Sequence, residues 1–152
     1  MFAHHLMTRN IECCTLEDTA AEAAAIMSRK NCGFVPVVKD RLTHTLVGVL
    51  TDRDIALYLG KINRRADAVK VKEFCTKDLR VAVSDTRICE IEEMMEKFHL
   101  HRIPVVDEQW RLVGVISLSD LAEEAWKDRN ALHPQVAEKE IAGIVESISM
   151  TD

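Results

Sequence analysis

Residues 35–56 read VPVVKDRLTHTLVGVLTDRDIA and residues 103–122 read IPVVDEQWRLVGVISLSDLA, so the chain carries one pattern twice. Each copy begins with an apolar residue and Pro-Val-Val, and continues through a polar connection to Leu-Val-Gly-Val. Thr or Ser then stands three positions before Asp. Solenoid proteins stack shorter and more numerous repeats than this pair. The duplication therefore predicts two small α/β units related by pseudo-twofold symmetry.

Local signals around each copy predict the same elements, in the order strand, helix, strand, strand, helix. A Thr19–Glu22 capping box starts the first helix, and Gly33 and Gly60 are expected close to the ends of the two helices of the first copy. In that copy the expected elements are a strand over 11–15, a helix from Thr19 to a stop near residues 31–33, strands over 34–38 and 45–50, and a helix over 51–60 with apolar residues at Ile55, Leu57 and Leu59. In the second copy they are 79–83, 85–97, 102–106, 112–116 and 117–126.

A unit of about 55 residues with so few strands leaves one sheet face uncovered. The expected fold class is therefore α/β of the α+β kind, with two repeats packed sheet to sheet. We assign residues 1–60 to the first repeat, 61–70 to a linker, 71–126 to the second repeat and 127–152 to a C-terminal helical tail. In the tail, Pro134 can start a helix whose apolar face packs on its own domain or on a partner chain.

The composition is typical of a globular protein of the cytoplasm. Of the 152 residues, 47% are hydrophobic and 30% are charged, and no apolar run is long enough to span a bilayer. The start, MFAHHLMTRN, lacks the pattern of a secretory signal. The five cysteines include no CxxC pair, which is typical of reduced thiols. A net charge of −5 argues against a nucleic-acid surface, which needs a basic face.

One stretch between the copies is basic, with positive side chains at Lys61, Arg64, Arg65, Lys70 and Lys72. The stretch can be a solvated linker, or it can attract an anionic ligand to a neighbouring cleft. The sequence leaves both interpretations open.

The main candidates for a site are two hydroxyl–carboxylate pairs, Thr51 with Asp54 and Ser117 with Asp120. A hydroxyl at a helix N-cap with an acid three residues later is a helix cap, which needs no ligand. The same geometry suits a ribose phosphate, because free N–H groups at a helix N-terminus bind phosphate and a carboxylate accepts hydrogen bonds from a ribose diol. Each pair also follows a strand glycine, where a backbone can approach closely.

The duplicated pattern, with an Ala- or Met-rich helix before each copy, resembles a tandem cystathionine-β-synthase (CBS) domain pair, also called a Bateman module. The match covers roughly residues 5–126, and the stretches 48–56 and 101–107 are similar to those of small stand-alone bacterial and archaeal members. The resemblance implies up to two clefts between the repeats that bind adenosine derivatives, and no catalytic cofactor. It favours AMP, ADP or ATP as the ligand over S-adenosylmethionine or NAD.

The family pattern implies a role for each matching position. The aspartates hold the ribose hydroxyls, the Thr and Ser lie near the phosphates, and residues at the start of the first strand and in the Pro-Val-Val strand enclose the base. By this pattern the first copy uses Thr8, Asn10, Ile11, Val35, Pro36, Thr51, Arg53 and Asp54. The second copy uses Thr76, Asp78, Leu79, His101, Arg102, Ile103, Pro104, Ser117 and Asp120.

The copies differ where phosphate would be contacted. The His101–Arg102 pair resembles one that contacts phosphates in some nucleotide-sensing members, and Arg can bind phosphate through two hydrogen bonds. The matching residues of the first copy are Gly33 and Phe34. Arg53 could pair either with a phosphate or with a neighbouring aspartate. We therefore expect one dominant ligand site.

Three other functions compete with ligand sensing. The first is an enzyme, but the sequence contains no GxSxG elbow, Walker loop, HExxH helix or Rossmann fingerprint. A hydrolytic pair of Cys13 or Cys89 with His99 or His101 remains an open alternative. Metal or redox sensing would use the paired histidines near the N-terminus or the His-x-His at 99–101, whose rings would share one face of a strand. The serious alternative is a ligand-independent scaffold for dimerisation or docking, in which the same pairs are simple helix caps.

The preferred function is regulatory. An adenine nucleotide would bind, favour one arrangement of the two units or of two chains, and so act on an unidentified effector protein. We expect a homodimer of CBS pairs, with no catalytic residues, no metal, no membrane contact and no nucleic acid.

Overall fold

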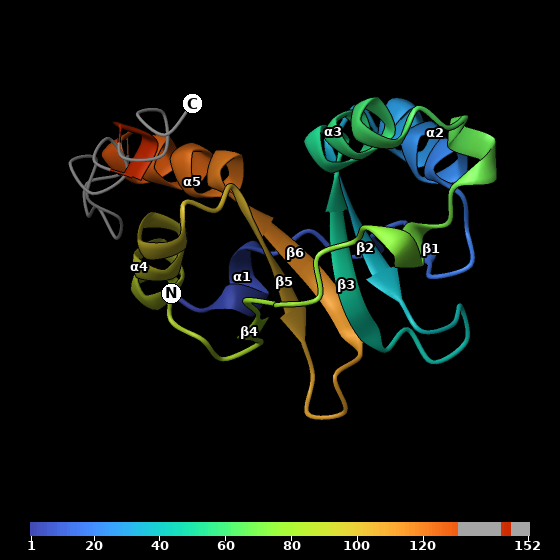
Figure 1. Ribbon diagram of the computed structural model, residues 1–152. Coiled ribbons are helices and arrows are strands. Elements are labelled where there is room, and N and C mark those ends of the chain that lie inside the picture. Colours follow the sequence, from blue (N-terminus) through green and yellow to red (C-terminus); the bar gives the residue numbers. More distant parts are fainter. Residues whose placement is uncertain (131–143, 147–152) are drawn as a thin grey trace. The chain divides into compact units, whose positions relative to one another are not determined.

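The computed structural model describes residues 1–130 and 144–146, with side chains described for 1–127 and 144–146. It has two three-stranded sheets with helices (Figure 1), which confirms the expected mixed α/β class. Within these residues no helix is long and apolar enough to cross a membrane. The tail helix expected from Pro134 lies outside the described residues except at 144–146, which are helical.

The chain forms two compact units that do not follow the repeat boundaries. Unit 1 contains Met1–Asn10, Arg80–Glu108 and Val113–Asp152, and unit 2 contains Ile11–Leu79 and Gln109–Leu112. The first ten residues therefore belong to the unit that is built mainly from the second repeat.

The sheet of unit 2 has the strand order β1 (Cys14–Thr15), β2 (Phe34–Val38) and β3 (Leu46–Thr51). β1 is parallel to β2, and β2 is antiparallel to β3. The predicted hairpin is confirmed, whereas β1 is shorter than the strand expected over 11–15. The helices pack their apolar side chains on this sheet in one core, which includes Ala23, Met27, Val35, Val37, Leu50 and Ile55.

Helix α2 (Ala20–Lys30) of unit 2 begins as its sequence predicts. The Glu22 Oε2 accepts a hydrogen bond from the Thr19 N–H at 2.7 Å, and the Thr19 Oγ1 accepts one from the Glu22 N–H at 3.2 Å. These two bonds satisfy N–H groups that the first turn of a helix leaves without an intrahelical partner. The capping box at this position is confirmed.

Both helices of unit 2 end at asparagine. α2 ends at Asn31, with a φ of 49°, and α3 (Asp52–Ile62) ends at Asn63, with a φ of 50°. The expected end of the first helix near residues 31–33 is confirmed, with Asn31 as the capping residue. The end expected near Gly60 was wrong, because Gly60 lies inside α3. Asparagine can take the left-handed conformation because its short polar side chain bonds to the local backbone.

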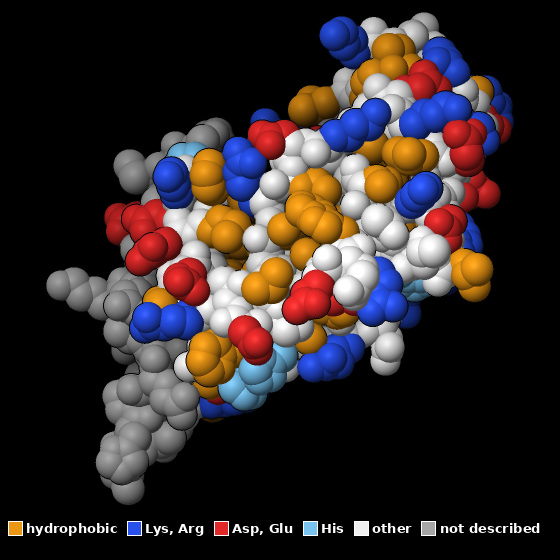
Figure 2. All heavy atoms as spheres, turned by 90° about the horizontal axis from the view of Figure 1, so that it is seen from below, with side chains coloured by type: hydrophobic (Ala, Val, Ile, Leu, Met, Phe, Trp, Pro, Cys, Tyr) orange, Lys and Arg blue, Asp and Glu red, His pale blue; other side chains and the backbone are white. Residues whose placement is uncertain are grey.

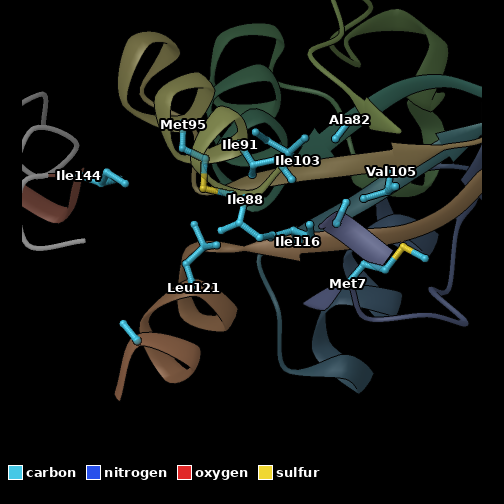
Figure 3. Close-up of a cluster of buried hydrophobic side chains, with 12 residues drawn as sticks. Met7, Ala82, Ile88, Ile91, Met95, Ile103, Val105, Ile116, Leu121 and Ile144 are labelled. Atoms are coloured by element: carbon cyan, nitrogen blue, oxygen red, sulfur yellow. The ribbon is translucent and has the colours of Figure 1, made fainter. Parts of the chain in front are cut away.

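Unit 1 contains the second set of elements. Its sheet has the order β4 (Ala82–Val83), β5 (Arg102–Val106) and β6 (Leu112–Ser117), and β4 is parallel to β5. Its helices are α1 (Ala3–Leu6), α4 (Ile88–Phe98) and α5 (Leu118–Asn130). Figure 3 shows the core of this unit, which includes Met7, Ile88, Ile91, Met95, Ile103, Val105, Ile116 and Leu121.

The N-terminal helix α1 was not expected from the sequence. Ala3 is fully buried, and its N–H donates to the Thr86 carbonyl oxygen at 2.8 Å. The His4 N–H donates to the Ser84 carbonyl oxygen at 3.0 Å. A four-residue helix is too short to show a hydrophobic period, so only these tertiary contacts reveal it.

The basic stretch between the repeats is folded. It contains the short helices η1 (Ala66–Ala68) and η2 (Val71–Glu73), and Val69 and Val71 are fully buried. Its cations pair with nearby acids: Arg64 with Glu73, Arg65 with Asp67, and Lys72 with Glu17. These pairs favour a structural role over attraction of an anionic ligand. Charged side chains of both signs are interspersed over the face drawn in Figure 2.

Candidate functional site

The edge of each third strand pairs with a segment from elsewhere in the chain. In unit 2 the N–H and C=O of Val49 exchange hydrogen bonds of 3.0 and 2.9 Å with Thr76. In unit 1 the N–H and C=O of Val115 exchange bonds of 3.0 and 2.9 Å with Thr8. We call residues 7–10 and 75–78 the lead-in segments, because each precedes the first strand of a repeat.

This pairing explains the proline in the Pro-Val-Val strand of unit 2. Pro36 lies opposite Val49 in the register of β2 and β3. The N–H and C=O of Val49 point to Thr76, so the position opposite Pro36 is not a hydrogen-bonded one. Proline, which has no N–H, therefore fits this strand without loss of a bond to β3.

The strand glycines make room for the lead-in segments. A Cβ atom on Gly114 would lie 2.7 Å from the Met7 Sδ and 2.9 Å from the Thr8 carbonyl oxygen. A Cβ atom on Gly48 would lie 3.1 Å from the Thr76 carbonyl oxygen. The close approach expected at these glycines is therefore made by the backbone of the chain itself.

The lead-in segments regroup the predicted site residues. The sequence-based grouping placed Thr8 with the first copy and Thr76 with the second. The structure shows the reverse, because Thr8 pairs with β6 and Thr76 pairs with β3. That grouping was wrong, since local sequence does not specify which sheet edge a preceding segment joins. The regrouped sets are Thr8, Asn10, His101, Arg102, Ile103, Pro104, Ser117 and Asp120 in unit 1, and Ile11, Val35, Pro36, Thr51, Arg53, Asp54, Thr76, Asp78 and Leu79 in unit 2.

Both hydroxyl–carboxylate pairs form helix caps. At α3 the Asp54 Oδ2 accepts from the Thr51 N–H at 2.9 Å, and the Thr51 Oγ1 accepts from the Asp54 N–H at 3.1 Å. At α5 the Asp120 Oδ2 accepts from the N–H and the hydroxyl of Ser117, both at 2.7 Å. Each cap engages the Oδ2 atom, and a carboxylate can accept further hydrogen bonds through its other oxygen. Capping is therefore compatible with binding of a ligand hydroxyl.

The residue that precedes β2 and the residue that precedes β5 each lie next to a helix cap. The His101 carbonyl oxygen accepts from the Leu118 N–H of α5 at 2.8 Å, and the Gly33 carbonyl oxygen accepts from the Asp52 N–H of α3 at 3.1 Å. His101 is exposed and Arg102 is half-buried. The structure thus brings the His-Arg pair beside the Ser–Asp cap at the N-terminus of α5.

Two residues predicted to enclose the base are buried in the cores. Val35 and Ile103 are 0% exposed, and each belongs to the hydrophobic core of its unit. Side chains alternate along a strand, so the neighbouring Pro36 and Pro104 point to the opposite face of each sheet. The register of each strand therefore places the Val35 and Ile103 side chains in the cores, and contact of these positions with a base stays a prediction.

Burial makes the adjacent cysteines of unit 2 poor nucleophiles. It raises the pKa of the Cys13 thiol to about 11 and that of the Cys14 thiol to about 12, and the thiolate is the reactive form. A hydrolytic pair built on Cys13 is therefore disfavoured. Among the described residues, no group of three or more His, Cys, Asp or Glu side chains could hold a metal ion.

We expect the thiols to react in the order of their exposure. At pH 8 Ellman's reagent should modify Cys89, which is exposed on α4, within the fast phase. Cys13 and Cys14 should react only after urea unfolds the chain, or as the pH approaches their raised pKa values. A Cys89→Ser variant should lose the fast phase. Fast modification of Cys13 or Cys14 in the folded chain at pH 8, located by peptide mapping, would contradict this order.

The two sheets and the like-built caps define a duplicated α/β module. The family model of the CBS domain matches residues 3–61 and 71–127. The chain therefore belongs to the CBS-domain family and carries a pair of CBS domains, as the resemblance implied. YlbB, an uncharacterized protein of Bacillus subtilis (strain 168), is 35% identical over 117 residues, which are 77% of each chain.

Solved CBS-domain structures share this fold. The structure of CBSX2 in complex with AMP has a TM-score of 0.73 at 22% identity, and the match covers 84% of this chain and 98% of that chain. The CBS domain pair of protein MJ0100, in complex with 5′-methylthioadenosine and S-adenosyl-L-methionine, has a TM-score of 0.72 at 24% identity. That match covers 81% of this chain and 98% of the other.

Proposed function

We propose that the chain is a regulatory module that binds an adenosine-containing ligand beside its capped helices and transmits the binding to another protein. One observation carries the proposal: each repeat holds a partly exposed aspartate and a hydroxyl at the N-terminus of the helix that follows its hairpin. The binding of AMP by CBSX2, and of methylthioadenosine and S-adenosylmethionine by MJ0100, supports the ligand class.

The chemistry of the caps suits an adenine nucleotide. In unit 1, Asp120 accepts hydrogen bonds from the ribose hydroxyls through its second oxygen, and Ser117 lies near the phosphate. The positive end of the α5 dipole and the cationic Arg102 side chain favour a negative charge at this position. AMP, ADP and ATP are the preferred ligands, ahead of S-adenosylmethionine and NAD.

Regulation requires that the ligand favours one arrangement of the protein over another. We infer that the chain acts without catalysis, as a homodimer, on an effector protein that reads this change. The free thiols, of which Cys13, Cys14 and Cys75 are buried, fit a reducing compartment, and we propose a cytoplasmic location.

The test is the loss of AMP binding on removal of one carboxylate. We expect Asp120→Ala to lower the affinity for AMP at least about tenfold in titration calorimetry, since the ribose hydroxyls lose a charged acceptor. The same change removes a helix cap, which costs about 1 kcal/mol of stability. Circular dichroism and thermal unfolding should show that the variant is still folded at the temperature of the titration.

A matched control separates the two effects. Glu22→Ala removes the equivalent acid of the α2 capping box, which lies outside both sets of candidate site residues. This variant should lose about as much stability as Asp120→Ala and should leave the affinity for AMP unchanged. Equal AMP affinity in the wild type and in Asp120→Ala, or no adenosine ligand bound by the wild type, would instead support a scaffold in which the caps are purely structural.

A further inference from the structure

The first turn of α3 contains an aspartate that has no counterpart in α5. The Asp52 carboxylate lies directly over Gly33, since a Cβ atom on that glycine would be 2.6 Å from the Asp52 Oδ2. Equivalent backbone hydrogen bonds match Gly33 with His101, and Asp52 with Leu118. A carboxylate in unit 2 therefore lies against the position from which an imidazole projects in unit 1.

Asp52 also occupies a backbone donor of its own helix. The Asp52 Oδ1 accepts from the Arg53 N–H at 2.8 Å. The Asp52 N–H donates to Gly33, and the Asp54 N–H donates to the Thr51 hydroxyl. All of the first three N–H groups of α3 therefore already have acceptors. A phosphate at a helix N-terminus needs such N–H groups to be available.

The N-terminus of α5 differs in its donors. The Leu118 N–H donates to His101, and the Asp120 N–H donates to the Ser117 hydroxyl at 3.2 Å. Within the described part of the chain, the intervening Ser119 N–H has no acceptor outside its own helix. This helix therefore keeps one first-turn donor that a ligand oxygen can reach.

The charges follow the same division. In unit 2 the positive Arg53 stands between Asp52 and Asp54, and the opposite charges of Lys77 and Asp78 in the lead-in segment balance each other. This neighbourhood carries one net negative charge. In unit 1 the cap contributes the single carboxylate of Asp120, and the strand entry beside it contributes the cationic Arg102 next to His101. A nearby negative charge disfavours a phosphate, whereas an uncharged or positively charged substituent meets no such repulsion.

We propose that Asp52 is a specificity-determining residue, which makes the unit 2 site accept adenosine derivatives that lack a phosphate, while the unit 1 site takes the nucleotide. This inference rests on the proposed function and divides its ligands between the two sites. One chain can then respond to two chemically different adenosine compounds.

The experiment compares AMP with adenosine by equilibrium dialysis. The wild type should bind two molecules of adenosine per chain and one of AMP over the same concentration range. Asp52→Asn removes the charge but keeps an oxygen that can accept from the Arg53 N–H. This variant should gain a second AMP, through an increase of about tenfold or more in the affinity of the weaker site. The control Glu93→Gln, an exposed change on α4 with the same effect on net charge, should still bind only one AMP.

The possible outcomes are distinct. Two equivalent AMP sites in the wild type, or an unchanged AMP stoichiometry in Asp52→Asn with two adenosine molecules still bound, would overturn the role of Asp52 and leave the proposed function intact. Failure of the wild type to bind either AMP or adenosine would overturn both.

Discussion

Replacing Gly114 by alanine is expected to lower the free energy of unfolding by about 2–3 kcal/mol, which is the usual range for overpacking. The new Cβ atom would lie 2.7 Å from the Met7 Sδ and 2.9 Å from the Thr8 carbonyl oxygen. The methionine side chain can turn away, but the carbonyl oxygen cannot move without loss of its hydrogen bond from the Val115 N–H. The lead-in segment would therefore separate from β6.

Gly60 provides the matched control. Gly60 lies inside α3, and a Cβ atom there would meet nothing within 4 Å. Gly60→Ala should raise stability by about 0.5–1 kcal/mol, because alanine has the higher helix propensity. Urea unfolding followed by circular dichroism measures both changes. Equal stability of Gly114→Ala and the wild type would show that the lead-in segment is not held against this strand.

Truncation of Ile91 to alanine is expected to cost about 3–4 kcal/mol, because deleting buried methyl groups removes apolar burial and leaves a cavity. Ile91 is 0% exposed on α4 and belongs to the core of unit 1 in Figure 3. The loss is a large fraction of the stability of an ordinary domain. The urea midpoint should fall sharply.

Leu57→Ala is the control for this truncation. Leu57 lies on α3 and is 62% exposed, although it is one of the apolar residues in the predicted helix pattern. The change should alter stability by no more than about 0.5 kcal/mol. A large loss of stability in Leu57→Ala would indicate that another surface covers this residue in solution, such as that of a second chain.

The elements that the sequence predicted best are those with a local signal. The hairpin strands 34–38 and 102–106 agree with their predicted ranges, since β-branched residues and a polar connection specify a hairpin over a short distance. The capping boxes of α2 and α3 also follow from the spacing of two side chains. The end of α3 has a weaker local signal, because asparagine and glycine both permit the left-handed conformation, and the helix continues past Gly60 to Asn63.

The candidate site was predictable in its residue types but not in its assembly. The spacing of Thr51 and Asp54, repeated at Ser117 and Asp120, located both caps correctly. The burial of Val35 and the carboxylate of Asp52 over Gly33 could not be seen in the sequence. Both depend on the register of strands and on contacts between elements that the pattern does not define.

The sequence by itself determined that the chain has two like-built α/β units with a hydroxyl–carboxylate cap in each, because these features depend on residues a few positions apart. Only the tertiary structure decided which lead-in segment joins which unit. A β-strand edge offers hydrogen bonds to any extended segment, so partner choice rests on the fit of backbone against Gly48 and Gly114. That fit places Thr8 with the second repeat and Thr76 with the first.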